Sequence, residues 1–446
     1  MAVATPPAGP SATTVPPPPG RRPWGRWLIA GAFLAPAALF LGVWIIYPTI
    51  STIIRSFYDR DGSNFVGWDN YRELFTSDTL LTAIRNNAIW VAVVPILVTA
   101  IGLVFAVLTE RVRWSVAFKT AVFMPMAISL FAAGVIWHLM DQKDPDIGTI
   151  NATIGAVYDK VRPPGALSSG LPSSSALTGS PSSGLTLAKP VPAGGVATLG
   201  LTGIPPDQVP EGARQAVRPP PREGAVSGVV WRDFKPGGGT PGRLEKGELG
   251  LPGVQVSVKG ANGGGGGSAT TGDDGAFRVD GLAPGDYRVS VSSATFREPF
   301  GGIDWLGPSL INIAVMGAYI WVWAGFAMVV IAAGLSALPR DVLEAARTDG
   351  ASEWQVFRRV TVPLLAPVLS VVFITMIIYV LKVFDIILSV APGSTQDDAN
   401  VIAVALWRTA FGGVNDFGLG SAIATFLFVL VIPVLLLNVR RFRREN

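Results

Sequence analysis

Apolar residues gather in long runs near both ends of the 446-residue chain, and a more polar stretch separates the two groups. A helix needs about 20 apolar residues to cross a bilayer. Six runs are long enough, so the pattern predicts an all-α integral membrane protein with six transmembrane helices. The predicted spans cover residues 27–47, 88–108, 119–139, 309–335, 364–388 and 417–438.

The stretch between the third and fourth spans contains a region in which apolar and polar residues alternate. Alternation over a few residues, bounded by Pro-Gly or Asp-Gly turns, is typical of half-buried strands. Four such segments predict an inserted all-β sandwich, immunoglobulin-like or prealbumin-like, over 226–298. The predicted strands cover residues 226–231, 254–259, 276–280 and 287–291.

Two other stretches have too few large apolar residues to form a core. Residues 159–225 are rich in Pro, Ser, Gly and Ala and nearly lack aromatic side chains, which predicts a flexible linker. Residues 1–22 contain a run of four prolines and predict a disordered tail. The membrane core is therefore expected in two pieces, 23–158 and 303–446.

Arginine and lysine near the span ends are shared unequally between the two sides of the membrane. The N-terminal tail, the loops that follow spans 2 and 4, and the C-terminus together carry 14 of them, whereas the loops 48–87 and 389–416 carry five. Cytoplasmic loops are enriched in these residues. Both termini are therefore expected in the cytoplasm of a multi-pass plasma-membrane protein, and residues 141–303 are expected outside it.

Composition excludes several kinds of site. The chain has no cysteine and one histidine, His138, which excludes disulfides, thiolate metal centres and catalytic pairs of histidines. None of the eight lysines follows a glycine, so the chain has no P-loop for ATP. Gly and Pro together account for 87 residues, and 47 of these lie within 161–302. The Gly- and Pro-rich character therefore belongs mainly to the insert.

The segment 338–367, between the fourth and fifth spans, predicts two short helices joined by a sharp turn. Pro339 suits the first turn of a helix, and Val342, Leu343 and Ala346 form an apolar stripe along it. Gly350 suits the left-handed position that follows a helix C-terminus.

The second helix of this segment has its own start signal. Ser352 and Gln355 form a capping-box pattern, and Trp354 and Phe357 share one face. Pro363 is expected to end this helix or to kink it into the fifth span. Such a pair of helices fits a groove on a soluble partner or a lipid surface contacted by its arginines, and spacing alone does not decide between them.

The same segment resembles the EAA loop of ABC-importer permeases, and the string EAARTDGASEWQVFRRVTVPLLAPVL is similar to the carbohydrate, maltose-type branch. The strings DPDIGTIN, LKVFDIILSVAPGS and RTAF elsewhere in the chain are also similar to that branch. The resemblance covers about 24–158 and 303–446, with the EAA coupling loop at 338–363. The matching loop residues are Glu344, Ala345, Ala346, Asp349, Gly350, Ala351, Phe357 and Pro363.

This resemblance implies a transporter subunit and not an enzyme. In the family, the EAA loop inserts into a cleft on a cytoplasmic ATPase, and closure of two ATPase subunits switches the membrane part between inward- and outward-facing states. ATP and magnesium are bound by those partner subunits, so this chain is expected to hold no cofactor. The other implied partners are a second permease, homologous or identical, and an extracytoplasmic sugar-binding protein. No nucleic acid is implied.

The predicted sandwich resembles the B-type repeat domains of Gram-positive surface proteins and the carboxypeptidase-regulatory-like modules. Some relatives bind calcium in the first loop, where this chain has Asp233, Glu245 and Glu248. The intervening string FKPGGGTPGRL lacks the further oxygen ligands that calcium needs, so acidic turn residues are the better interpretation. The role of the sandwich stays open between a spacer, a docking aid for the binding protein and an adhesive contact.

Polar residues inside the predicted spans are candidates for a translocation path, because charges at membrane depth are costly and usually face a cavity. Tyr379, Lys382 and Asp385 are expected on one face of the fifth span, and Asn312 lies in the fourth. Sugars are bound by hydrogen bonds and aromatic faces, which these side chains offer. The alternative, favoured for Lys382 and Asp385, is a structural ion pair near the outer end of the span.

The sequence therefore predicts the permease subunit of an ATP-driven importer for a mono- or oligosaccharide. A glycerol-phosphate or polyol importer of the same branch is an alternative. Another is a cell-surface display protein anchored by its spans, although an anchor has no use for an EAA loop. An ion-coupled secondary transporter would need several buried acids at mid-membrane, and Asp385 is the one candidate.

Overall fold

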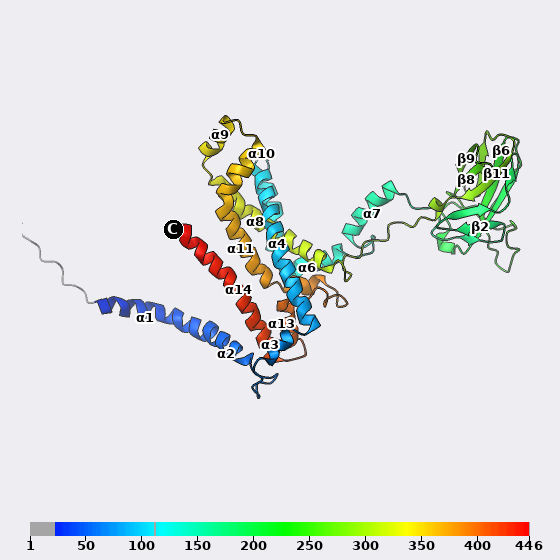
Figure 1. Ribbon diagram of the computed structural model, residues 1–446. Coiled ribbons are helices and arrows are strands. Elements are labelled where there is room, and N and C mark those ends of the chain that lie inside the picture. Colours follow the sequence, from blue (N-terminus) through cyan, green and yellow to red (C-terminus); the bar gives the residue numbers. More distant parts are fainter. Residues whose placement is uncertain (1–22, 111–112, 446) are drawn as a thin grey trace, which may run out of the picture. The chain divides into compact units, whose positions relative to one another are not determined.

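The computed structural model describes residues 23–110 and 113–445 and divides into two compact units (Figure 1). The first, the helical unit, takes its described residues from Met1–Met124, Trp323–Ile387 and Ala399–Asn446. The second, the insert unit, comprises Pro125–Val322 and Leu388–Asp398. The tail predicted at 1–22 lies outside the described residues.

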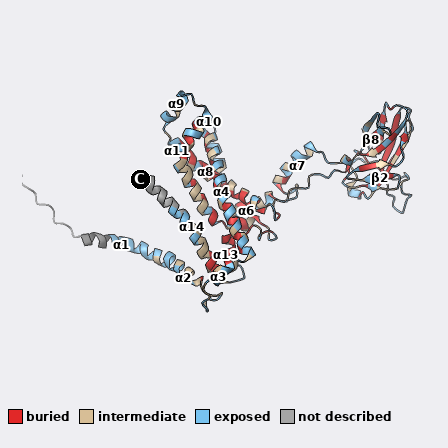
Figure 2. Ribbon diagram, in the orientation of Figure 1, coloured by how far each residue is buried: buried red, intermediate tan, exposed pale blue. Residues whose placement is uncertain are grey.

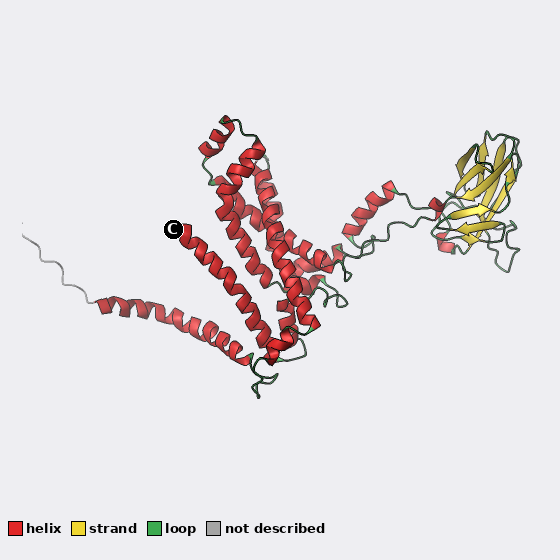
Figure 3. Cartoon of the chain, in the orientation of Figure 1, coloured by secondary structure: helices red, strands yellow, loops and turns green. Residues whose placement is uncertain are grey.

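The helical unit consists of helices joined by short connections (Figure 3). Two further helices, α8 (Ile311–Ser336) and α12 (Asp385–Val390), cross the boundary between the units. Turns of π-helix occur at Gly42–Ile46 and Phe357–Thr361. The helices of the unit are α1 (Pro23–Leu41), α2 (Tyr47–Arg55), α3 (Asp69–Leu74), α4 (Asp78–Glu110), α5 (Ser115–Phe123), α9 (Arg340–Thr348), α10 (Glu353–Val356), α11 (Val362–Leu381), α13 (Ile402–Phe411) and α14 (Phe417–Glu445).

Within the described residues, four helical stretches are long and apolar enough to cross a membrane. A fifth is added if the apolar pair Ser115–Ala127 and Leu130–Met140 forms one broken span. The sixth predicted span corresponds to α14, whose apolar stretch Phe417–Pro433 is shorter than the others. The lengths and compositions of these helices are those of an integral membrane protein. The four long stretches are Ala30–Arg55, Asp78–Glu110, Ile311–Ser336 and Glu353–Leu381.

Helix α4 packs into the helical unit along one narrow stripe. Every fourth residue from Trp90 to Ala106 faces inward, so the stripe follows the helical repeat. At Gly102 an added Cβ would lie 2.5 Å from the Cβ of Ala327, so glycine permits the close approach of α4 to α8. The described side chains of α1 contrast with α4, because they are exposed along the helix (Figure 2). The buried stripe comprises Trp90, Val94, Val98, Gly102 and Ala106.

The insert unit contains α6 (Leu130–Met140), α7 (Thr149–Val161) and a sandwich of two β-sheets. One sheet has the order β1-β5-β6-β10, with β7 paired to β6, and the other has the order β2-β3-β11-β8-β9, with β4 paired to β11. The strands are β1 (Leu171–Pro172), β2 (Leu177–Ser180), β3 (Gly184–Leu187), β4 (Val191–Pro192), β5 (Val196–Thr202), β6 (Ala225–Arg232), β7 (Leu249–Gly250), β8 (Gln255–Gly260), β9 (Gly266–Thr270), β10 (Ala276–Asp280) and β11 (Asp286–Val291).

The four predicted strands correspond to β6, β8, β10 and β11, but the flexible linker expected over 159–225 is corrected by the structure. Strands β1 to β5 lie within it, and β5 pairs in parallel with β6. Leu199 and Leu201 of β5 are fully buried in the core between the sheets. The apolar residues of this stretch are sparse, yet the strands place them inward while Pro and Gly occupy the turns. Composition alone could not reveal this placement.

The chain enters and leaves the insert at one place, which we call the clasp. The side-chain amide of Asn151 donates to the backbone oxygens of Gln142, at 2.8 Å, and Ile303, at 2.9 Å. The Ile303 N–H donates back to the Asn151 side-chain oxygen at 2.9 Å. Further out, the Gly165 N–H donates to the Arg297 oxygen at 2.8 Å. The clasp thus binds the two chain segments together at the base of the insert.

Candidate coupling loop and translocation path

The first helix of the EAA loop, α9, ends in a Schellman motif. Gly350 has φ +83°, its N–H donates to the Arg347 oxygen, and the Ala351 N–H donates to the Ala346 oxygen. A Cβ on Gly350 would meet nothing within 4 Å, so glycine is required there by the backbone conformation and not by lack of space. The predicted left-handed turn is therefore present. Pro339 occupies the N-cap of α9, one residue before the position predicted for it.

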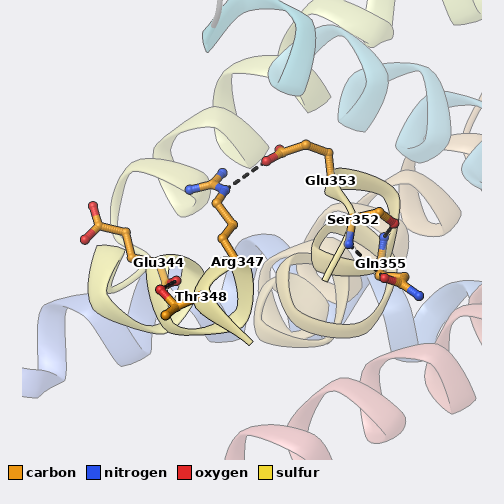
Figure 4. A network of polar contacts seen from close by, with 6 residues as sticks. All are labelled: Glu344, Arg347, Thr348, Ser352, Glu353 and Gln355. Atoms are coloured by element: carbon orange, nitrogen blue, oxygen red, sulfur yellow. Dashed lines mark hydrogen bonds and ion pairs between the residues drawn. The ribbon is translucent and has the colours of Figure 1, made fainter. Parts of the chain in front are cut away.

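The second helix, α10, begins at the capping box that the sequence predicts. The Ser352 N–H donates to Gln355 Oε1 at 2.8 Å, and the Gln355 N–H donates to Ser352 Oγ at 3.4 Å (Figure 4). An ion pair crosses the turn, with Arg347 Nε 2.9 Å from Glu353 Oε1. The hydrogen bond that Arg347 donates to the Glu353 carboxylate raises the pKa of the Arg347 guanidinium. These contacts fix the angle between α9 and α10.

Helix α10 continues through a π-helical turn at Phe357–Thr361 into α11. Pro363 lies in the first turn of α11, so it neither ends the helix nor lies outside it. Proline lacks the N–H that would bond to the carbonyl four residues earlier, and a π-turn accommodates the missing bond. The second helix of the loop is thus part of one continuous helical stretch, Glu353–Leu381.

Most side chains of the loop point outward. The structure describes all of α9, and none of its residues is buried. Trp354 is 66% exposed, although its ring lies 5.5 Å from the ring of Phe357. Figure 4 shows the Glu344 carboxylate pointing away from the pair of Arg347 and Glu353. Ala345 and Asp349 are also exposed. A polar face with one large exposed aromatic residue is typical of a surface that another protein covers.

Behind the loop lies a hollow of about 480 Å³ between α4, α5, α8 and α9. Both positively and negatively charged side chains line the hollow, so it does not favour a ligand of one charge over the other. Because Glu344 and Arg347 lie at its rim, a partner residue that contacts Glu344 would also reach the hollow. The lining residues are Thr109, Glu110, Ser115, Lys119, Leu335, Ser336, Leu338, Arg340, Leu343, Glu344 and Arg347.

The candidate path residues lie on a broken helix. Helix α11 ends at Leu381, Lys382 caps it, and α12 begins at Asp385. The expectation that Tyr379, Lys382 and Asp385 share a face of one helix is therefore wrong. Asp385 occupies the first position of α12, where an acidic residue favours a new helix start.

Aromatic side chains gather beside this break. The ring of Tyr379 lies 4.7 Å from the ring of Trp323, a neighbour that the sequence pattern did not single out. Lys382 Nζ lies 5.7 Å from the centre of the Tyr379 ring, a cation–π contact. Asn312 belongs to the insert unit, where its amide donates to the Asp398 oxygen at 2.9 Å. The break thus combines an aromatic pair with exposed charges at Lys382 and Asp385.

The calcium candidates accept hydrogen bonds from the chain. Asp233 Oδ2 accepts from the Gly242 N–H, and Glu248 Oε2 accepts from the Glu245 N–H at 2.7 Å. Glu245 also lies 3.5 Å from Lys235 Nζ. Burial, with the nearby Asp233 charge, raises the pKa of Glu248. Among the described residues, no group of three or more His, Cys, Asp or Glu side chains is placed to hold a metal ion.

Two family models match the chain. Residues 289–443 match the model described as "Binding-protein-dependent transport system inner membrane component". Residues 245–300 match the carboxypeptidase regulatory-like domain, which covers the second half of the sandwich.

Two curated relatives match most of the chain, and a third matches a shorter part of it. The osmoprotective compounds uptake permease protein GgtC of Synechocystis is 29% identical, over 93% of this chain and 99% of that protein. The alpha-glucoside transport system permease protein AglF of Rhizobium meliloti is 28% identical, over 95% of this chain and 83% of that protein. A putative ABC transporter permease protein of Caldicellulosiruptor is 32% identical over 28% of this chain and 88% of that protein.

A solved structure shares the fold along nearly the whole chain. It is a bacterial ABC transporter that imports the acidic polysaccharide alginate, with a TM-score of 0.55, 15% identity, and coverage of 95% of this chain and 99% of that one. The membrane helices, the EAA loop geometry and these matches agree. The chain belongs to the binding-protein-dependent inner membrane components of ABC transporters.

Proposed function

We propose that this chain is a permease subunit of an ATP-driven importer for a mono- or oligosaccharide. The single observation that carries the proposal is the solvent-exposed EAA loop, whose capped helix α10 continues into the apolar helix α11. Such a loop has no role in a protein that is only anchored by its spans. The sugar class is supported by relatives whose names include alpha-glucoside transport and by the fold of an alginate importer.

The proposed mechanism is alternating access driven by separate ATPase subunits. The exposed Glu344 and Trp354 enter a cleft on an ATPase, and the Schellman turn, the capping box and the Arg347–Glu353 pair together orient α10 relative to α9. Continuous helix from α10 to α11 then carries the displacement to the break at Lys382. Two ATPases, a second permease and an extracytoplasmic sugar-binding protein complete the importer, and ATP and magnesium are bound by the ATPases.

The orientation that fits this mechanism places the EAA loop and both termini in the cytoplasm and residues 141–303 outside. The distribution of arginine and lysine supports it. In intact cells, an impermeant thiol reagent should label a cysteine placed in the sandwich and not one placed in α9. If the reagent labelled the cysteine in α9 and not the one in the sandwich, the orientation would be the opposite of the one proposed.

The broken helix at Lys382 is proposed as part of the sugar path. Non-helical backbone at membrane depth is tolerated where it lines a cavity, and the aromatic pair of Tyr379 and Trp323 offers a face for a sugar ring. Tyr379→Ala should lower uptake at least tenfold while ATPase activity persists, whereas Tyr379→Phe should retain most uptake. Equal uptake in both variants would remove Tyr379 from the path.

The coupling proposal is tested by Gly350→Ala in the assembled importer, reconstituted with its binding protein. A Cβ fits in space at Gly350 but strains a backbone at φ +83°, at a cost of about 1 kcal/mol. We expect binding-protein-stimulated ATP hydrolysis and uptake to fall together. Glu344→Ala should do the same by removing an exposed charge.

The matched control is Gly393→Ala, because a Cβ there also meets nothing within 4 Å and the backbone carries no positive φ. Gly393→Ala should leave uptake unchanged. Normal uptake by both Gly350→Ala and Glu344→Ala would refute the coupling role of the loop.

A further inference from the structure

One face of helix α7 packs against residues 300–303, the segment that follows the sandwich in the chain. Asn151 is fully buried in the clasp. Gly155 faces Phe300, whose ring an added Cβ would meet at 3.1 Å. Further along, the rings of Tyr158 and Phe300 lie 5.5 Å apart. This packing fixes the rotation of α7 about its own axis.

The fixed rotation leaves an apolar stripe on a different face. Ile150, Ile154, Val157 and Val161 recur at helical spacing. The first two are half-buried, whereas Val157 is 63% and Val161 is 76% exposed. Burying such a stripe would stabilise it by about 25 cal/mol per Å² of apolar surface. The stripe therefore calls for an apolar surface outside this chain.

The start of α7 is held at the end of α6, the second half of the apolar pair that forms the broken-span candidate. Helix α6 ends at Met140, and Asn151 in the first turn of α7 binds the backbone of Gln142, two residues beyond that end. Leu139, in the last turn of α6, is 54% exposed, which suits a lipid-facing position. Asn151 also binds Ile303, ahead of the apolar helix α8. Helix α7 thus begins beside the ends of two apolar helices.

Positive charge lies where the exposed end of the stripe meets water. Lys160 and Arg162 are both exposed on either side of Val161 in the chain, and the Arg162 guanidinium lies 6.0 Å from the centre of the Tyr158 ring. The acidic neighbour Asp159 is turned to the other side, where its Oδ1 accepts from the Phe300 N–H at 3.3 Å. An apolar stripe edged by lysine and arginine is complementary to a bilayer surface that carries anionic phosphates.

We propose that α7 is an interfacial helix, with its stripe of Ile150, Ile154, Val157 and Val161 in the acyl boundary and Lys160 and Arg162 on anionic headgroups. The helix would anchor the base of the insert to the bilayer. It would also restrict the directions in which the sandwich can extend from the membrane.

The absence of cysteine from the natural chain gives a direct test. Single-cysteine variants Val157→Cys, Val161→Cys and Ala152→Cys would be spin-labelled in the assembled transporter, in nanodiscs of phosphatidylcholine and phosphatidylglycerol. Ala152 is the matched control because it is exposed on the opposite side of α7. Labels at 157 and 161 should collide more with oxygen than with a water-soluble nickel chelate, at a depth of about 5–10 Å. The label at 152 should show the opposite preference.

Two outcomes would overturn the proposal. Equal nickel accessibility at all three positions would place α7 in water, and protection of 157 and 161 from both reagents would show a protein partner on the stripe. Retained uptake in each variant shows that the helix is assembled normally. The headgroup contact is tested by Lys160→Gln with Arg162→Gln in the Val157→Cys background. Phosphatidylglycerol should deepen the label only when both cations are present, and the same depth without them would contradict that contact.

Discussion

At the scale of single residues, Asp141 is the most unusual carboxyl group in the described part of the insert unit. It directly follows α6, is 2% exposed, and has one side-chain oxygen without a hydrogen-bond partner among the described residues. Burial raises its pKa to about 6, against a small opposing effect of His138. Its carboxylate therefore costs stability at neutral pH.

The pH dependence follows from this raised pKa. Between about pH 4 and pH 6 the folded protein holds a proton on Asp141 that the unfolded chain has released, so stability falls as pH rises through this window. Asp141→Asn should raise the free energy of unfolding at pH 7 by up to about 3 kcal/mol and have little effect below pH 4. Thermal unfolding at both pH values measures this, with exposed Asp61→Asn as the control. If Asp141→Asn unfolded with the same pH dependence as the wild type, Asp141 would not be the source of that dependence.

The sequence predicted local features of the coupling loop and missed its longer contacts. Gly350 and the capping box of Ser352 and Gln355 depend on residues within one turn, so their spacing sufficed. The Arg347–Glu353 pair depends on the direction of the chain after the turn, which periodicity does not encode. The same limit explains the error at Lys382, because a helix break without Gly or Pro leaves no local signal.

At the scale of elements, β5 shows why the boundary of the sandwich was set too late in the chain. Residues 196–202 have the sequence VATLGLT, in which Ala197, Leu199 and Leu201 alternate with Thr198 and Gly200, but the surrounding stretch 159–225 is rich in Ser, Pro and Gly and resembles a linker. Yet β5 lies between β1 and β6, and its pairing with β6 runs from Val196 to Leu201. Its burial depends on a partner strand that follows after a long connection. The Ser-, Pro- and Gly-rich composition of the surrounding stretch outweighed the alternation within the strand.

This pairing predicts different behaviour for two fragments. Residues 163–299 should fold alone, with a cooperative urea transition followed by circular dichroism, because they contain both sheets and their shared core. Residues 224–299, which hold the four strands evident from the sequence, should lack that transition because β6 loses its neighbour β5. A cooperative transition in the shorter fragment would show that β5 is dispensable.

At the scale of the whole molecule, the clasp makes the sandwich separable from the membrane part. Pro163 and Arg297 lie together, with Arg297 Nη1 donating to the Pro163 oxygen at 3.2 Å. Replacing residues 163–298 by a short Gly-Ser linker should therefore leave a membrane core that inserts and binds its ATPases. Extending the deletion to 149–302 removes Asn151 and should abolish assembly. Affinity purification measures how much of the complex each deletion variant forms. If both variants lose the complex equally, the sandwich is an integral part of the membrane core.

The sheet order also has a consequence for biosynthesis. Leu185 of β3 pairs with Val291 of β11, so the second sheet cannot close until almost the whole insert has been synthesised. On the proposed orientation, β2 and β3 can pair with each other once they have crossed the membrane, but β3 must wait for β11. Strongly hydrophobic segments with high β-propensity would aggregate during such a delay. We expect the Ser-, Pro- and Gly-rich composition of residues 159–225, which resembles a linker, to keep β3 soluble until β11 has been synthesised.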